Sequence, residues 1–133
     1  MTNQELGNIG EELACNYLMK EGYRLLHRNW RLKGGCEIDI VAFKDNALHF
    51  VEVKTRTSTF SSPLQAVNME KIRHVSRAAF TYKKYFHHDY DTRIDAIGIV
   101  FRSNTDYEIK FIPDVHLNLT DYGYSKRHGY SKR

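Results

Sequence analysis

Two acidic residues and a lysine interrupt the most strand-like segment of the chain, GCEIDIVAFKDNALHFVEVKTR at residues 35–56. Asp39 lies within one apolar run, while Glu52 and Lys54 lie in and just after the next. A turn centred on Asp45-Asn46 would join the two runs as a hairpin whose opposed residue numbers sum to 91. Asp39 then faces Glu52, and Lys54 shares their face because side chains alternate along a strand.

This register divides the hairpin into two faces. One face carries the polar residues Glu37, Asp39, Glu52 and Lys54 and continues towards the turn with Val41, Phe43, Leu48 and Phe50. The other face carries Ile38, Ile40, Val51 and Val53. The inference depends on the register, since a three-residue turn would move Asp39 to the opposite face.

Opposed carboxylates favour a divalent cation. The two negative charges repel each other across a strand pair, and a dication between them reverses the sign of that interaction. Mg²⁺ prefers oxygen ligands and is often held by one or two carboxylates together with a phosphate. Lys54 could contact a metal-bound water or stabilise the charge that develops on an attacked phosphodiester. The pattern therefore predicts metal-assisted phosphodiester hydrolysis.

A solvated hairpin face is the alternative that the residues alone leave open. In that case Glu37–Lys54 and Glu52–Arg56 would be ordinary ion pairs at the surface. The position of Glu52 within the apolar run Phe50–Val53 favours the metal site, because a lone surface charge is less expected there.

Helical and strand patterns place this hairpin in an α/β domain. Residues 3–20 predict a helix with a capping box, and Glu11 lies at the edge of its apolar stripe, from which it could reach the sheet. Residues 63–86 predict a second, largely cationic helix that begins after Ser62. Strands are expected at 23–29, 38–43, 48–53, 93–101 and 107–112, with a loop at 30–35. This order predicts an α/β fold around a mixed sheet.

The composition fits a single globular domain, with 133 residues of which 41% are hydrophobic and 27% charged. No apolar run is long enough to cross a bilayer and the first residues lack a secretory signal, so a cytoplasmic protein is expected. Cys15 and Cys36 form neither a disulfide framework nor a C-x-x-C motif.

The formal net charge of +4 belongs to the last nine residues, SKRHGYSKR. They hold four of the 20 basic residues, and the other 16 balance the 16 acidic residues that precede them. The unit GYSKR occurs twice, and two copies of so short a unit cannot bury a core. We therefore expect one domain over residues 1–120 and a disordered basic tail over 121–133.

A series of motifs runs along most of the chain. They are Gly7-x-x-Gly10-Glu11-x-x-Ala14-x-x-Tyr17-Leu18, Gly22-Tyr23, Arg28-Asn29-Trp30-Arg31, Glu37-Ile38-Asp39, Phe50-Val51-Glu52-Val53-Lys54-Thr55-Arg56, Lys71, Ala78 and Arg93-Ile94-Asp95. Together they resemble the bacterial YraN family, uncharacterised protein family 0102, over roughly residues 5–101. That family is similar in pattern to the PD-(D/E)xK, restriction-endonuclease-like nucleases and to archaeal Holliday junction resolvases.

The resemblance implies a restriction-endonuclease-like αβββαβ core, in which helices flank a central mixed sheet. It implies that Mg²⁺ or Mn²⁺ is bound by Asp39, Glu52, Glu11 and the carbonyl of Val53, and that Lys54 assists the water. The catalytic residues would be Glu11, Asp39, Glu52 and Lys54. Two departures from the family pattern are Cys36, where glycine is usual, and Ile38, where the motif name has proline.

Nucleic acid, most of all DNA, is the partner that the resemblance implies, with branched or single-stranded DNA as candidate substrates. Candidate phosphate contacts are Arg56, Lys71 and the tail pairs Lys126-Arg127 and Lys132-Arg133, although the tail could instead serve only solubility. A resolvase would also require a homodimer, because two strands must be cut together. The alternative is a non-catalytic module that binds nucleic acid or partner proteins in DNA repair or recombination.

Other polar residues favour structural roles. The adjacent His87-His88-Asp89 would diverge as a solvated loop, and Cys15 would be an inert thiol. Asp95 is expected to be a hydrogen-bonding structural acid. The cationic second helix is expected to be mainly a solvated face, although it could also lie along a phosphate backbone.

Overall fold

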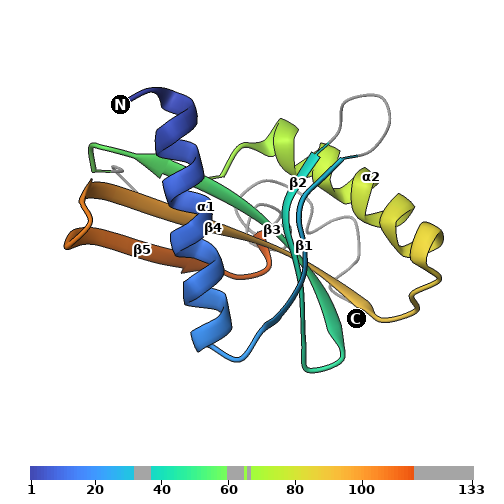
Figure 1. Ribbon diagram of the computed structural model, residues 1–133. Helices are drawn as coiled ribbons and strands as arrows, with labels where there is room; N and C mark the ends of the chain where they lie inside the picture. Colours follow the sequence, from blue (N-terminus) through green and yellow to red (C-terminus); the bar gives the residue numbers. More distant parts are fainter. Residues whose placement is uncertain (32–36, 60–64, 66, 116–133) are drawn as a thin grey trace.

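Residues 1–31, 37–59, 65 and 67–115, which the computed structural model describes, form one mixed sheet with a helix on each face (Figure 1). In chain order the elements are α1 (Asn3–Lys20), β1 (Arg24–Arg31), β2 (Glu37–Lys44), β3 (Ala47–Arg56), α2 (Met69–Phe86), β4 (Asp91–Ser103) and β5 (Asp106–Ile112). The strands lie in the order β1-β2-β3-β4-β5. Only β3 and β4 pair in parallel, and the other neighbours are antiparallel. The predicted α/β fold with an αβββαβ core is confirmed.

Most strands are longer than the apolar runs that predicted them. Trp30 and Arg31, which were expected in a loop, belong to β1 and pair with β2. β3 continues to Arg56 because it pairs with β4 along its whole length, from Ala47 to Arg56. The central position of β3 thus keeps its charged end in the sheet.

Helix α1 begins and ends as its sequence predicts. The Glu5 N–H donates to Thr2 Oγ1 at 3.0 Å, and the Thr2 N–H donates to Glu5 Oε1 at 2.7 Å, which completes a capping box. Gly22, with φ of +93°, follows its last turn and reverses the chain towards β1.

Helix α2 begins at Met69, so the predicted start at Pro63 is wrong. The side chain of Asn68 accepts a hydrogen bond from the Lys71 N–H at 3.1 Å and caps the helix. The predicted cap at Ser62 lies outside the described residues. Among the described residues, no helix is long and apolar enough to cross a membrane.

The sheet buries an apolar layer on each face. The layer under α2 contains Val41, Leu48, Phe50, Ile72, Val75 and Tyr82, among others. The layer under α1 contains Ala14, Leu18, Ile40, Val51, Ile97 and Ile99, among others. These two sets follow the predicted alternation along the hairpin, except that Ile38 packs in the α2 layer and not with Ile40.

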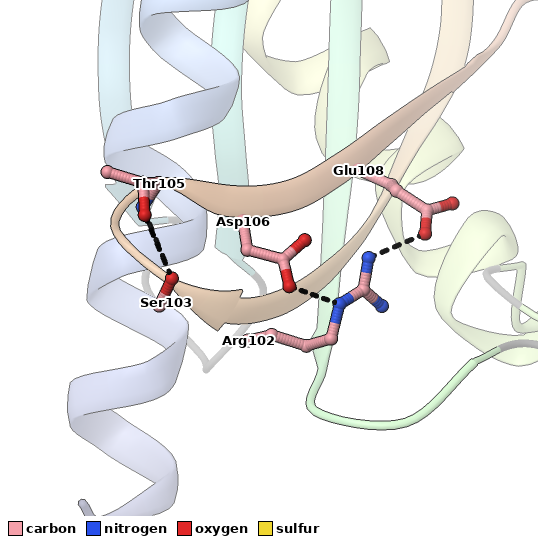
Figure 2. A network of polar contacts seen from close by, with 5 residues as sticks. All are labelled: Arg102, Ser103, Thr105, Asp106 and Glu108. Atoms are coloured by element: carbon pink, nitrogen blue, oxygen red, sulfur yellow. Dashed lines mark hydrogen bonds and ion pairs between the residues drawn. The ribbon is translucent and has the colours of Figure 1, made fainter.

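The β4–β5 hairpin is closed by charged side chains at its surface (Figure 2). Arg102 Nε lies 3.0 Å from Asp106 Oδ2, and its Nη2 lies 2.7 Å from Glu108 Oε2. Hydrogen bonds to these two carboxylates raise the pKa of Arg102. These exposed ion pairs link β4 to β5 but add little to stability, and the backbone ladder from Ala96↔Ile112 to Ser103↔Asp106 pairs the two strands.

Candidate functional site

Strands β2 and β3 separate at one end, and the sheet forks there (Figure 1). Their pairing runs from Lys44↔Ala47 to Ile40↔Val51, which confirms the predicted sum of 91 over this stretch. Beyond it, β2 continues along β1 as far as Glu37, and β3 continues along β4 as far as Arg56. We call this opening, with Asp39, Glu52 and Lys71 around it, the fork.

Asp39 occupies the place where the β2–β3 ladder has opened. Its carboxyl is almost fully buried, with 7% of the residue exposed, and Oδ2 accepts a hydrogen bond from the Val53 N–H at 2.9 Å. The side chain therefore replaces the main-chain acceptor that a continued ladder would supply. Burial raises the pKa of Asp39, while the Val53 N–H and the charge of Lys71 oppose that rise.

Glu52 is buried beside Asp39, with 9% of the residue exposed. Its Oε2 lies 3.1 Å from Lys71 Nζ, whereas its Oε1 is buried and meets no hydrogen-bond donor among the described residues. Burial and the negative charge of Asp39 raise the pKa of Glu52 to about 8. When Glu52 is ionised, Oε1 is a buried acceptor without a donor among the described residues, which costs about 1–3 kcal/mol and which a cation would offset; when Glu52 is protonated, it can donate to Asp39.

Lys71 reaches the fork from the first turn of α2, which the Asn68 cap fixes. Partial burial lowers the pKa of Lys71, but attraction to Glu52 outweighs that effect and the net pKa is raised. The ammonium therefore supplies one positive charge between the helix and the acidic pair. The sequence predicted Lys71 as a phosphate contact and gave no sign of this ion pair.

Helix α1 comes close to the fork because Gly10 has no side chain. A Cβ atom at this position would lie 1.8 Å from Thr55 Oγ1 on β3. The next residue, Glu11, has a raised pKa, mainly because of its burial and then because of the charge of Asp39. The close helix–strand contact thus brings a third carboxyl within electrostatic reach of the pair.

Asn29 is a residue of this site that the sequence analysis named only within a motif. It lies in β1 with a left-handed φ of 52°, between the pairs Arg28↔Ile40 and Trp30↔Ile38. This places it beside Asp39, and its side chain favours the charged form of Glu11 by hydrogen bonding. Asparagine adopts positive φ more readily than most residues, and such a position inside a strand often marks a functional site.

The solvated-face alternative is wrong for both central acids, since Asp39 and Glu52 are buried. Glu37 pairs with Arg31 at 3.5 Å, and Glu52 pairs with Lys71. The ion pairs of that alternative, Glu37–Lys54 and Glu52–Arg56, are therefore not the ones observed for these two acids.

The remaining predicted site residues lie on β3 or outside the described residues. Lys54 is exposed and follows Glu52 by two positions, so strand alternation directs both to the same face. Val53 is half-buried, and its N–H is bound to Asp39. Arg56 is half-buried at the end of β3. Lys126, Arg127 and Cys36, together with the tail 121–133, lie outside the described residues.

The fork offers a cation two buried carboxylates and no complete side-chain ligand set. In the described part of the chain, no three His, Cys, Asp or Glu side chains are grouped so as to hold a metal ion. This donor set still suits Mg²⁺ or Mn²⁺, because Mg²⁺ commonly keeps several waters and binds through one or two carboxylates. It would not suit zinc, which prefers four closely grouped nitrogen or sulfur ligands.

Asp95 forms a separate buried pair away from the fork. Its Oδ2 lies 2.6 Å from His49 Nδ1, and its Oδ1 accepts a hydrogen bond from the Asp114 N–H at 2.8 Å. Both carboxyl oxygens thus have partners, as expected of the structural acid that the sequence predicts. Cys15 is also buried, and burial raises the pKa of its thiol, which agrees with an inert role.

The family model described as "Uncharacterised protein family UPF0102" matches residues 10–99, which is more than half of the chain. The chain belongs to the UPF0102 family. A UPF0102 protein of Bacteroides thetaiotaomicron is 45% identical over 113 residues, covering 84% of this chain and 92% of that protein. The relative in Trichlorobacter lovleyi is 39% identical over 115 residues, covering 84% and 90%.

A UPF0102 protein of Syntrophomonas wolfei is 52% identical over 83 residues, which cover 62% of this chain and 71% of that protein. The predicted family is therefore confirmed. The matched region of the UPF0102 model includes the acids Glu11, Asp39 and Glu52 and the lysine Lys71. The family description states no activity, so a function has to be argued from the fork itself.

Proposed function

We propose that this UPF0102 protein is a metal-dependent endonuclease that hydrolyses DNA phosphodiesters at the fork. One observation carries the proposal, namely that two buried acids adjoin each other and that Oε1 of Glu52 meets no donor among the described residues. These two carboxylates share one ammonium, that of Lys71, so keeping both of them ionised in the fold is costly. Functional sites are where costs of this kind are commonly retained.

The fork residues have distinct roles in this proposal. Asp39, Glu52 and the carbonyl of Val53 would hold Mg²⁺ or Mn²⁺, which would supply a more acidic bound water and polarisation of the phosphate. Glu11 would accept hydrogen bonds from water at the edge of the fork. Lys54 would orient the attacking water or stabilise the charge that develops on the phosphate.

Lys71 would change partner when the site is loaded. In the present structure its ammonium neutralises part of the charge on Glu52. A dication would take over that task and leave Nζ for a phosphate oxygen, with Arg56 as a second contact from β3. The phosphate-contact role predicted from the sequence is thus compatible with the ion pair.

DNA in the cytoplasm is the proposed substrate, and branched or single-stranded DNA are its candidate forms. The tail residues Lys126 and Arg127 would add phosphate contacts. A homodimer would be needed for the symmetric cutting of a four-way junction.

A second function is favoured by the Lys71–Glu52 ion pair itself. This contact at 3.1 Å already compensates one carboxylate without a metal. The protein could therefore be a non-catalytic module that binds nucleic acid or repair and recombination proteins.

Hydrolysis assays separate the two functions. Labelled linear, single-stranded and four-way DNA should be cut only with Mg²⁺ or Mn²⁺, and Asp39→Asn, Glu52→Gln and Lys54→Ala should each abolish cutting. Calorimetric titration of Mn²⁺ should show binding that the two acid variants lose. Glu70→Gln removes an exposed acid next to Lys71 and should change neither result. If the protein binds the DNA substrates but cuts none of them, the second function is favoured.

A further inference from the structure

A groove of about 780 Å³ lies at the C-terminal end of α2, between that helix and the start of β4. Its lining includes Phe80, Lys83 and Lys84 from the helix, and His87, His88 and Thr92 from the segment that follows. None of these residues belongs to the fork. The helix meets the fork at its other end, through Lys71.

The groove combines an exposed aromatic ring with two lysine side chains. Phe80 is 67% exposed, and Lys84 Nζ lies 5.4 Å from the centre of its ring. Lys83 Nζ donates a hydrogen bond to Thr92 Oγ1 at 3.0 Å, which holds that ammonium against the start of β4. Asp89 is the acidic residue in the lining, so positive side chains outnumber it.

The lysines alone have an ordinary explanation, because cations in the last turn of a helix complement its dipole. That explanation does not account for Phe80, a large apolar ring that is mostly exposed one helical turn before the two lysines. Exposed aromatic faces among cations are typical of surfaces on which the bases of single-stranded nucleic acids stack.

We propose that this groove binds single-stranded nucleic acid, with one base stacked on Phe80 and the adjoining phosphates paired with Lys83 and Lys84. Stacking requires an unpaired base, because the faces of bases within a duplex are already covered by their neighbours. The two ammonium groups supply the charge complementarity that a phosphate backbone requires.

The position of the groove relates it to the fork. Phe80 lies nine residues after Lys71 on one uninterrupted helix, which corresponds to about 14 Å along its axis. The exposed residues Arg73 and Arg77 are at helical spacing with Phe80 and extend the positive surface of the groove, whereas Lys71 projects from the opposite side of the helix. The passage of a bound strand from the groove to the fork rests on the proposed nuclease function. Binding of the strand in the groove does not depend on that function.

Binding should be measured on the full-length protein in EDTA, where metal-dependent cleavage cannot occur. The probe is a fluorescein-labelled oligothymidylate of about 20 nucleotides, which exceeds typical single-strand sites. Phe80→Ala should weaken binding about tenfold, and Phe80→Trp should retain it, because every base can stack on an aromatic face. Tyr85→Ala is the matched control, since Tyr85 is 70% exposed on the same helix but does not line the groove.

Two further measurements separate the contribution of the bases to binding from that of the phosphates. An abasic strand keeps the phosphates and lacks the bases, so it should bind the wild type and Phe80→Ala equally. Replacing both Lys83 and Lys84 by Gln should reduce the slope of log K against log salt by about 1.4, for two phosphates lost. Thermal melting of each variant verifies that the fold is retained.

The proposal is overturned if Phe80→Ala binds oligothymidylate like the wild type, or if Tyr85→Ala loses as much affinity. Equal wild-type affinity for the single strand and a matching duplex would also overturn it. The result is independent of the proposed catalysis. A loss of metal-dependent cutting in Asp39→Asn with unchanged binding in EDTA would support both proposals, while absence of cutting in the wild type would remove only the first.

Discussion

Replacing Glu52 by Gln tests whether the buried acid of the fork lowers the free energy of unfolding. Gln keeps the shape of the side chain and an oxygen that can accept from Lys71, but it removes the buried negative charge. In the wild type, burial and Asp39 raise the pKa of Glu52 from 4.5 to about 8. Between these values the native state holds a proton that the unfolded state releases, so the free energy of unfolding falls as pH rises.

The size of this effect follows from the shift. Each pH unit within the window costs about 1.4 kcal/mol, so the loss from pH 4.5 to pH 8 is about 5 kcal/mol. Between pH 5.5 and 7.5 the contribution of Glu52 is about 2 to 3 kcal/mol. The raised pKa of Asp39 acts in the same direction. Glu52→Gln should therefore show a flatter pH profile and greater stability above pH 7.

Urea unfolding in EDTA measures this difference, with the fluorescence of the single tryptophan, Trp30, as the probe. Glu70→Gln is the control, because Glu70 is exposed in the first turn of α2 and should leave the profile unchanged. Mg²⁺ should stabilise the wild type above pH 7 and leave Glu52→Gln unaffected. If the wild type and Glu52→Gln lose the same free energy between pH 5.5 and 7.5, Glu52 is not a buried, proton-binding acid.

Three further substitutions have expected outcomes. Gly10→Ala should lower the unfolding free energy by about 1–3 kcal/mol or more in a thermal or urea melt, because its Cβ overlaps β3, whereas Gly7→Ala meets no atom within 4 Å and should be tolerated. Asp39→Asn should remove the rise in melting temperature produced by Mn²⁺, which the exposed-site variant Asp106→Asn should retain. Asp95→Ala should destabilise the fold by about 3 kcal/mol without altering the response to Mn²⁺.

The hairpin could be predicted because its information is local. Asp45 and Asn46 have left-handed φ values of 51° and 62°, as a two-residue hairpin turn requires, and both residue types tolerate that conformation. The turn fixes the register, and the register places the side chains of β2 and β3 on their faces as far as Ile40 and Val51. The helix α1 is local in the same sense, since its capping box lies within four residues.

The fork could not be predicted because it is where the local pattern stops. Continued pairing would have placed Glu37 opposite Lys54 and Ile38 beside Ile40. Instead β2 follows β1, and Ile38 packs under α2. The ion pair between Lys71 and Glu52 joins residues far apart in the chain, and no spacing rule predicts such a contact.

The rigidity of α2 gives the two proposals a joint consequence. The helix begins beside the fork and ends at the groove, and its 18 residues contain neither Gly nor Pro. An axial separation of about 14 Å corresponds to about four nucleotides at the 3.4 Å spacing of a stacked strand. Because Lys71 and Phe80 project from opposite sides of α2, this separation is a lower bound, and a single strand held on Phe80 should be cut at a nearly constant distance of at least about four nucleotides from the stacked base. This distance can be measured by mapping the products of an end-labelled strand that has bases at one end and abasic sites elsewhere. If the cuts are scattered without relation to the position of the bases, the groove does not set the cleavage position.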